Sequence, residues 1–261
     1  MSAAAPSEAT DACWRCGTAL SRDAPSCIRC RAPRRRLPLA IRQRAARSGA
    51  AEPVSQVIAV YVVMLACSLA YGVLTRFGME GGAGDAREGL LLIVGLEVVH
   101  TALVAFAWWR LPPPVLEEGG SVSPAAAWAL SLPVVLGVLA ANAGYHALLR
   151  SVLHVARAGD PLLASGVTPL AVGAYCLQPA IVEEVFFRSI VLDRLHAAVG
   201  VHAAVALSSL MFGLVHIGVP LSIPILIVLG LTLGYARVAS RGVVLPIAMH
   251  AAHNAIVMAL S

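Results

Sequence analysis

Apolar residues form long runs from Val54 onward, separated by short polar breaks, whereas residues 1–52 are polar and basic. The runs have these approximate limits: 54–75, 89–109, 125–149, 167–192, 200–217, 221–238 and 243–260. A helix that crosses a membrane needs about 20 mostly apolar residues. The first three runs and the last meet that length clearly, while 200–217 and 221–238 are short. The pattern predicts an all-α, polytopic membrane helix bundle of about seven transmembrane helices.

The composition supports a membrane protein. Hydrophobic residues make up 59% of the chain and charged residues 13%, whereas soluble domains carry about 25% charged residues. All 19 basic residues are Arg, so mechanisms that need a lysine, such as Ser–Lys dyads and Schiff bases, are excluded. The Ala-rich, Lys-free composition also hints at a bacterial source.

Positive charge is concentrated at the N-terminus. Residues 13–47 contain ten Arg and one acid, Asp23, whereas residues 48–261 contain nine Arg and eleven acids. A basic arm can bind nucleic acid or anionic lipid. Because this arm leads into an apolar run, we expect it to flank the lipid bilayer and expect no nucleic-acid partner. The positive-inside rule then predicts a cytoplasmic N-terminus and a multi-pass protein of the cytoplasmic membrane.

Four cysteines near the N-terminus form two CxxC pairs ten residues apart: Cys13, Cys16, Cys27 and Cys30. Four thiolates at this spacing suit a tetrahedral Zn²⁺ ion, and the pattern resembles the short zinc-ribbon modules of bacterial membrane and regulatory proteins. The alternative, redox-active pairs or disulfides, is disfavoured in a reducing cytoplasm. We predict a zinc ribbon at residues 1–32 with structural Zn²⁺, an Arg-rich juxtamembrane linker at 33–52, and a transmembrane domain at 53–261. The ribbon is a candidate site for a cytoplasmic protein partner.

Two adjacent carboxylates lie inside the fourth apolar run. Charged residues in a membrane span are costly and usually serve function. Arg188 follows Glu184 by four residues, so the two share a helix face and can form an ion pair. Glu183 points about 100° away and lacks that partner. A desolvated carboxylate without a cation partner is suited to accept a proton as general base; the alternative is an ion-pair cluster that only joins helices.

Polar residues recur in the later runs at the same helical spacing. Phe212 and His216 stand four residues apart, as do His250 and Asn254. Pro179 and Pro246 each precede one of these polar residues by four positions, where a proline frees a backbone carbonyl. The sequence has no HExxH or GxSG motif and no Asp at the centre of a run, which argues against zincin-like, rhomboid and presenilin-type proteases.

Three motifs of this sequence together resemble those of the CAAX-protease and bacteriocin-processing family of intramembrane proteases, the type II CAAX prenyl endopeptidases. The motifs are Glu183-Glu184-x-x-x-Arg188, Phe212-x-x-x-His216 and His250-x-x-x-Asn254. The resemblance covers residues 167–260. It implies an intramembrane endopeptidase in which Glu183 and His216 activate water, while His250 and Asn254 stabilise the oxyanion. Glu184, Arg188 and Phe212 are then supporting residues, and a divalent metal at the membrane site stays open. The substrate would be a membrane-associated protein or peptide.

Two other functions compete with the protease. One is a non-catalytic membrane scaffold or bacteriocin-immunity-type protein whose zinc ribbon recruits a cytoplasmic partner; intact motifs argue against it. The other is a small ion-coupled transporter, which lacks the expected internal repeats. Two further polar pairs, Glu97 with His100 and Asn142 with His146, are interpreted as contacts between packed helices rather than catalytic groups.

Overall fold

The computed structural model describes residues 52–79, 86–111, 122–154 and 169–260, and every regular element in these ranges is helical. The predicted zinc ribbon at residues 1–32 and nearly all of the linker at 33–52 lie outside the described residues. The elements are α2 (Glu52–Met79), α3 (Ala86–Arg110), α4 (Pro124–Leu153), α6 (Pro169–Val172), η1 (Gly173–Leu177), α7 (Gln178–Glu184), η2 (Val185–Val191), α8 (Leu192–Val199), α9 (Val201–Leu214), η3 (Pro220–Ser222), α10 (Ile223–Ser240) and α11 (Val244–Leu260). The predicted all-α class is confirmed.

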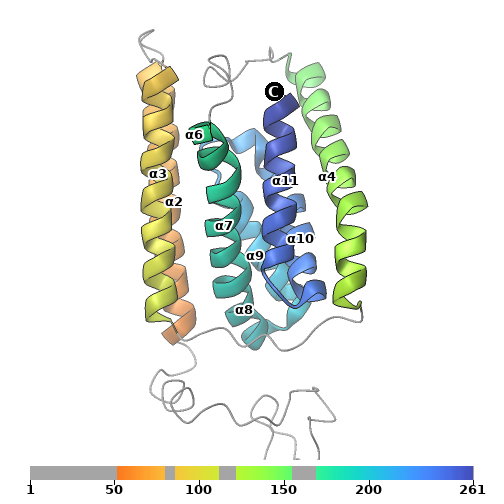
Figure 1. Cartoon of the computed structure of the whole chain (residues 1–261). Helices are drawn as coiled ribbons and strands as arrows, with labels where there is room; N and C mark the ends of the chain where they lie inside the picture. Colours follow the sequence, from red (N-terminus) through yellow and green to blue (C-terminus); the bar gives the residue numbers. More distant parts are fainter. Residues whose placement is uncertain (1–51, 80–85, 112–121, 155–168, 261) are drawn as a thin grey trace, which may run out of the picture.

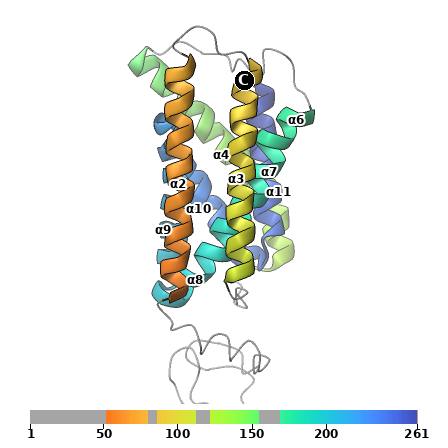
Figure 2. The same ribbon diagram turned by 90° about the vertical axis from the view of Figure 1, so that its left-hand side faces the viewer.

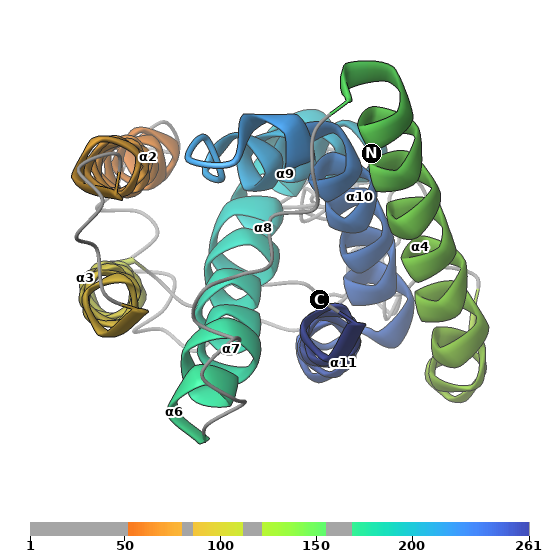
Figure 3. The same ribbon diagram turned by 90° about the horizontal axis from the view of Figure 1, so that it is seen from above.

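The elements from α6 to α8 follow one another without a break and form one long helix, which we call the central helix (Pro169–Val199). Successive helices alternate in direction, so α2 begins at the lower end of the bundle and α11 ends at the upper end (Figure 1). Seen from the side, α2 and α3 form a hairpin (Figure 2). Seen from above, this hairpin stands on one side, α4 lies on the opposite side, and the remaining helices lie between them (Figure 3).

Five of the described helical segments are long and apolar enough to cross a membrane: Val54–Thr75, Leu91–Arg110, Pro124–Leu153, Pro169–His196 and Pro220–Ser240. The chain is therefore a multi-pass membrane protein. Helices α9 and α11 are apolar but shorter, with 14 and 17 residues. Lipid-facing apolar side chains on α2, α3 and α4 agree with this assignment, because Trp109 is 70% exposed and Leu132 is 66% exposed.

One expected span length is wrong. The run 243–260 corresponds to α11 within one residue, and this helix of 17 residues follows the left-handed Arg241 with φ 59°. The run 221–238 was expected to be short, but its helix continues to Ser240. Arg237 does not end that helix because its Nη2 atom lies 3.4 Å from Oδ2 of Asp193, in a buried ion pair.

The central helix is the most enclosed element. Of its most apolar 18-residue window, 56% is buried, against 33% or less in the other four long spans. Its surroundings therefore shield the charged motif residues from lipid. Two π-helical segments, η1 and η2, lie on either side of the Glu183–Glu184 pair. Such widened turns occur frequently at functional sites.

Helices α9 and α10 approach each other closely at Gly230. A Cβ atom at this position would lie 3.0 Å from the Cβ atom of Ser209, so a larger residue would push the two helices apart. Small residues at such crossings allow the close backbone contact on which membrane helices depend for packing. The contact also places the Gly230 carbonyl oxygen beside the central helix, where it accepts a hydrogen bond from Nη2 of Arg188 at 3.4 Å.

Candidate active site

A buried network surrounds the Glu184 carboxylate. Its Oε2 atom lies 3.1 Å from Nε of Arg188, and its Oε1 atom lies 3.1 Å from Nδ1 of His250. Both Glu184 and Arg188 are fully buried, and His250 is 3% exposed. The predicted ion pair between Glu184 and Arg188 is therefore present. The network also joins the central helix to α11.

The Phe212 ring packs against the charged and imidazole side chains of this network. It lies 4.8 Å from Cζ of Arg188, measured to the ring centroid. Its centroid is also 5.1 Å from that of the His216 ring and 5.6 Å from that of the His250 ring. A cation over an aromatic face is stabilised by the ring's electron distribution. Phe212 thus holds the arginine and both histidines of the motifs in one packed cluster.

Glu183 faces His216 across a short gap. Its Oε1 atom lies 3.8 Å from Nε2 of His216, which is longer than a direct hydrogen bond. The other ring nitrogen, Nδ1, donates a hydrogen bond to the Phe212 carbonyl oxygen at 2.8 Å, because a carbonyl can only accept. This bond orients Nε2 toward the carboxylate. Among the described residues, Oε2 of Glu183 has no hydrogen-bond partner.

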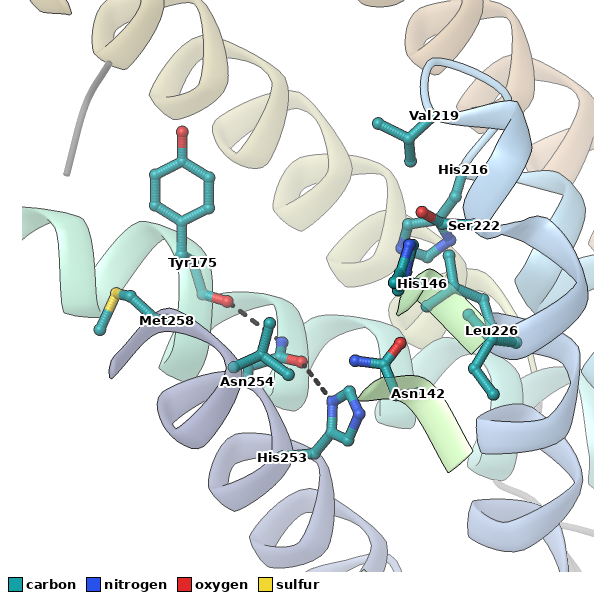
Figure 4. Close-up of a pocket in the computed structure, with 12 residues that line it drawn as sticks. Asn142, His146, Tyr175, His216, Val219, Ser222, Leu226, His253, Asn254 and Met258 are labelled. Atoms are coloured by element: carbon teal, nitrogen blue, oxygen red, sulfur yellow. Dashed lines mark hydrogen bonds between the residues drawn. The ribbon is translucent and has the colours of Figure 1, made fainter. Parts of the chain in front are cut away.

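A cavity of about 360 Å³ opens beside His216. Its wall carries polar groups from α4, the central helix, η3 and α11 (Figure 4). The lining residues are Asn142, His146, Tyr175, His216, Val219, Ser222, Ile225, Leu226, His253, Asn254, Val257 and Met258. His216 is therefore the residue that connects the cavity with the Glu183 carboxylate.

Asn254 is held at the cavity wall by two hydrogen bonds (Figure 4). Its Nδ2 atom donates to the Tyr175 carbonyl oxygen at 3.1 Å, and its Oδ1 atom accepts from Nδ1 of His253 at 3.3 Å. The bond to Tyr175 joins α11 to the backbone of the central helix.

The structure brings the predicted catalytic residues together in two layers. His216 and Asn254 line the cavity, and Glu183 lies next to His216. His250 is not among the lining residues; it contacts Glu184 instead. His253, which the sequence analysis did not assign to the site, lies on the cavity wall. Its position directly before Asn254 of the last motif was the feature of the sequence that could have indicated a place in the site.

The Asn142 and His146 pair also lies on the cavity wall, on α4. The interpretation of this pair as a helix–helix contact is not supported, because neither side chain makes a hydrogen bond within the described part of the chain. Their spacing of four residues in an apolar helix was the signal that could have indicated a shared functional face.

The other polar pair lies behind the catalytic residues, on α3. Glu97 is 8% exposed and His100 is 4% exposed, although most of α3 faces lipid. Glu97 interacts electrostatically with Glu183, and His100 with His216. Gln178 of the central helix fixes this contact, because its Nε2 atom donates to the Glu97 carbonyl oxygen at 3.0 Å. Glu97 thus contacts the central helix, whereas His100 hydrogen-bonds the Met64 backbone of α2.

The possibility of a divalent metal at the membrane site, left open by the sequence, gains no support from the described residues. Within them, no group of three or more His, Cys, Asp or Glu side chains is gathered so that it could hold a metal ion. Glu183 and His216 face each other, but His250 is engaged by Glu184. We therefore derive no reaction step through a metal.

Comparison with known proteins gives one assignment. Residues 165–256 match the family model described as type II CAAX prenyl endopeptidase Rce1-like. No curated protein and no solved structure matches the chain significantly. The matched segment begins just before the central helix and contains all three motifs, from Glu183 to Asn254. Residues 165–256, which contain all three motifs, are therefore similar to the Rce1-like family of type II CAAX prenyl endopeptidases.

Proposed function

We propose that this protein is an intramembrane endopeptidase that hydrolyses a peptide bond of a membrane-associated protein or peptide. The observation that carries the proposal is the 3.8 Å separation of Glu183 Oε1 from His216 Nε2, beside a cavity that His216 lines. A carboxylate and an imidazole that face each other at this distance can both contact one water molecule between them. The match of residues 165–256 to the family model supports the same reaction class.

Glu183 acts as the general base in this proposal. It removes a proton from the water molecule as the oxygen attacks the carbonyl carbon of the scissile bond. His216 orients that water through Nε2, because its Nδ1 atom is already committed to the Phe212 carbonyl. The proton held by Glu183 then passes to the leaving amine nitrogen. The products are a new carboxylate and a new amine.

Asn254 and His250 stabilise the negative charge that develops on the carbonyl oxygen. Hydrogen-bond donors held in place before the reaction lower the free energy of the charged intermediate. Asn254 is held by Tyr175 and His253 at the cavity wall. His250 is oriented by Glu184 and also interacts electrostatically with Glu183. Arg188 pairs with Glu184 and Phe212 packs against the His250 ring, so both residues hold His250 in place.

Comparative membrane proteomics tests the proposed function. Membranes from cells with the wild-type protein and with Glu183→Ala are compared for newly formed peptide termini. We expect at least one terminus in a membrane-associated protein to disappear in the variant. Unchanged termini in spite of equal protein levels would favour the non-catalytic scaffold over the protease.

The zinc ribbon stays a prediction, with Cys13, Cys16, Cys27 and Cys30 as the ligands. We expect the purified full-length protein to contain about one Zn²⁺ per chain, as a four-thiolate site implies. Replacing Cys27 and Cys30 by Ser should remove this zinc, because two thiolates cannot complete the tetrahedron. Elemental analysis measures the metal content. Equal zinc in both proteins would place the metal elsewhere or disprove the ribbon.

The cytoplasmic position of the N-terminus is also a prediction, based on the ten Arg between residues 13 and 47. A cysteine introduced at Ser48 in a variant without the other N-terminal cysteines reports the topology. A membrane-impermeant thiol reagent should label it only after the cells are permeabilised. Labelling in intact cells would reverse the orientation of the bundle.

A further inference from the structure

The α4 side of the cavity carries polar groups that the proposed reaction does not use. Asn142 and His146 are half-buried, line the cavity, and make no hydrogen bond within the described residues. They stand one helical turn apart, so both project from the same face of α4. Neighbouring α4 residues such as Leu136 and Leu148 are instead exposed to lipid, at 53% and 60%. Two unpaired polar side chains in such a helix indicate a binding surface.

This face of α4 is held in place from outside the cavity. The hydroxyl group of Tyr145, the residue before His146, donates a hydrogen bond to the Leu221 carbonyl oxygen at 2.7 Å. The Tyr145 ring also packs edge-on against the His146 ring, with centroids 5.4 Å apart. α4 is thereby fixed relative to η3, which contributes Ser222 to the cavity wall. Asn142 and His146 thus line the cavity from a helix that is hydrogen-bonded to η3 (Figure 4).

We propose that Asn142 and His146 bind the main chain of a substrate segment that enters the cavity in extended form. This inference rests on the proposed function, because it describes how the scissile bond reaches Glu183. A peptide bond inside an α-helix has its N–H and C=O groups engaged, so the segment must unwind before hydrolysis. In a membrane, each freed backbone group then needs a new partner. The amide and the imidazole of α4 supply such partners.

The spacing on α4 is within about 2 Å of the repeat of an extended chain, a difference that side-chain rotamers can cover. Side chains at positions i and i+4 of a helix have Cβ atoms about 5–6 Å apart. An extended chain rises about 3.4 Å per residue, so its groups on one side recur about every 7 Å. The Asn142 amide can donate to a carbonyl and accept from an N–H, and His146 can bond the next group on that side. Neutral amides and imidazoles suit peptide groups better than they suit a lipid phosphate.

A pair of peptides tests this proposal with the full-length protein in detergent. The first probe is a fluorescein-labelled hexapeptide of Leu, Val and Ala. The second has the same side chains but carries N-methyl groups on alternate backbone nitrogens, which removes hydrogen-bond donors and keeps the hydrophobicity. Fluorescence anisotropy measures both affinities, with Glu183→Gln as the parent protein so that neither peptide is cleaved.

We expect the parent to bind the unmethylated peptide about tenfold more tightly than the methylated one, as the loss of one or two hydrogen bonds implies. Asn142→Leu and His146→Leu should each weaken binding of the unmethylated peptide about three- to tenfold and leave the methylated peptide unaffected. Ser131→Ala is the matched control on α4, because the Ser131 hydroxyl bonds only its own helix at the Trp128 carbonyl. It should change neither affinity.

Equal affinity for the two peptides, or no binding of the unmethylated one, would overturn the proposal whatever the variants do. Unchanged binding in Asn142→Leu and His146→Leu would move the binding surface to another wall of the cavity. If either Leu variant aggregates, the Ala substitution takes its place, and the comparison of the two peptides on the parent still decides. Peptide selectivity that depends on α4, without any Glu183-dependent terminus in membrane proteomics, would disprove the protease and leave the peptide site standing.

Discussion

Replacing Glu183 by Gln is expected to abolish proteolysis while the protein still accumulates in the membrane. Gln keeps the size of the side chain and can still contact His216, so packing around the central helix is retained. It cannot accept a proton from water, and the loss of a general base typically lowers the rate about 10²–10⁴-fold. The Glu183-dependent peptide terminus, measured at matched protein levels, gives the size of the effect.

Glu97→Gln is the matched control for this change. It removes another buried carboxylate, on α3, which interacts with Glu183 only electrostatically. We expect this variant to retain activity within a few-fold of the wild-type protein. Full activity in Glu183→Gln, together with loss of activity in Glu97→Gln, would transfer the role of base to α3.

Replacing Glu184 by Gln is expected to act first on stability. The change leaves Arg188 fully buried without its ion-pair partner and removes the acceptor for Nδ1 of His250. Breaking a buried pair by removing one partner typically costs about 3–5 kcal/mol. We expect less protein in the membrane and a lower temperature of aggregation in detergent. Both quantities should be close to wild type in Glu183→Gln.

The double variant Glu184→Gln with Arg188→Met separates the ion pair from the size of the side chains. Removing both charges of a buried pair is often neutral, whereas removing one is not. The second substitution should therefore restore a large part of the stability lost in Glu184→Gln. A stable but inactive Glu184→Gln, beside a Glu183→Gln that fails to accumulate, would show that the two roles are reversed.

Several features of the site could be predicted because they depend only on helix geometry. The ion pair between Glu184 and Arg188 follows from their spacing of four residues in one helix. The separation of Glu183 from that pair follows from the 100° step between neighbours. The association of the three motifs follows from their apolar surroundings, because isolated charges in lipid are costly and seek partners on other helices.

Other features depend on which elements lie next to each other. Asn254 follows His250 by one turn, and the sequence does not show that Asn254 and His253 line the cavity while Nδ1 of His250 contacts Glu184. Nothing in the sequence of α11 shows on which side its cavity lies. The same holds for α4, where the polar pair Asn142 and His146 was interpreted as a contact between helices.

The sequence by itself determined that the chain is an all-α membrane protein and that its candidate catalytic residues lie between Glu183 and Asn254. It did so because hydropathy and helical spacing are local properties, set by residues within a few turns of one another. Only the tertiary structure decided that Glu183 faces His216, that Asn254 bonds the Tyr175 carbonyl of the central helix, and that α4 contributes Asn142 and His146 to the cavity wall. Those contacts join residues tens of positions apart, and their geometry is set by how closely small residues such as Gly230 allow the helices to pack.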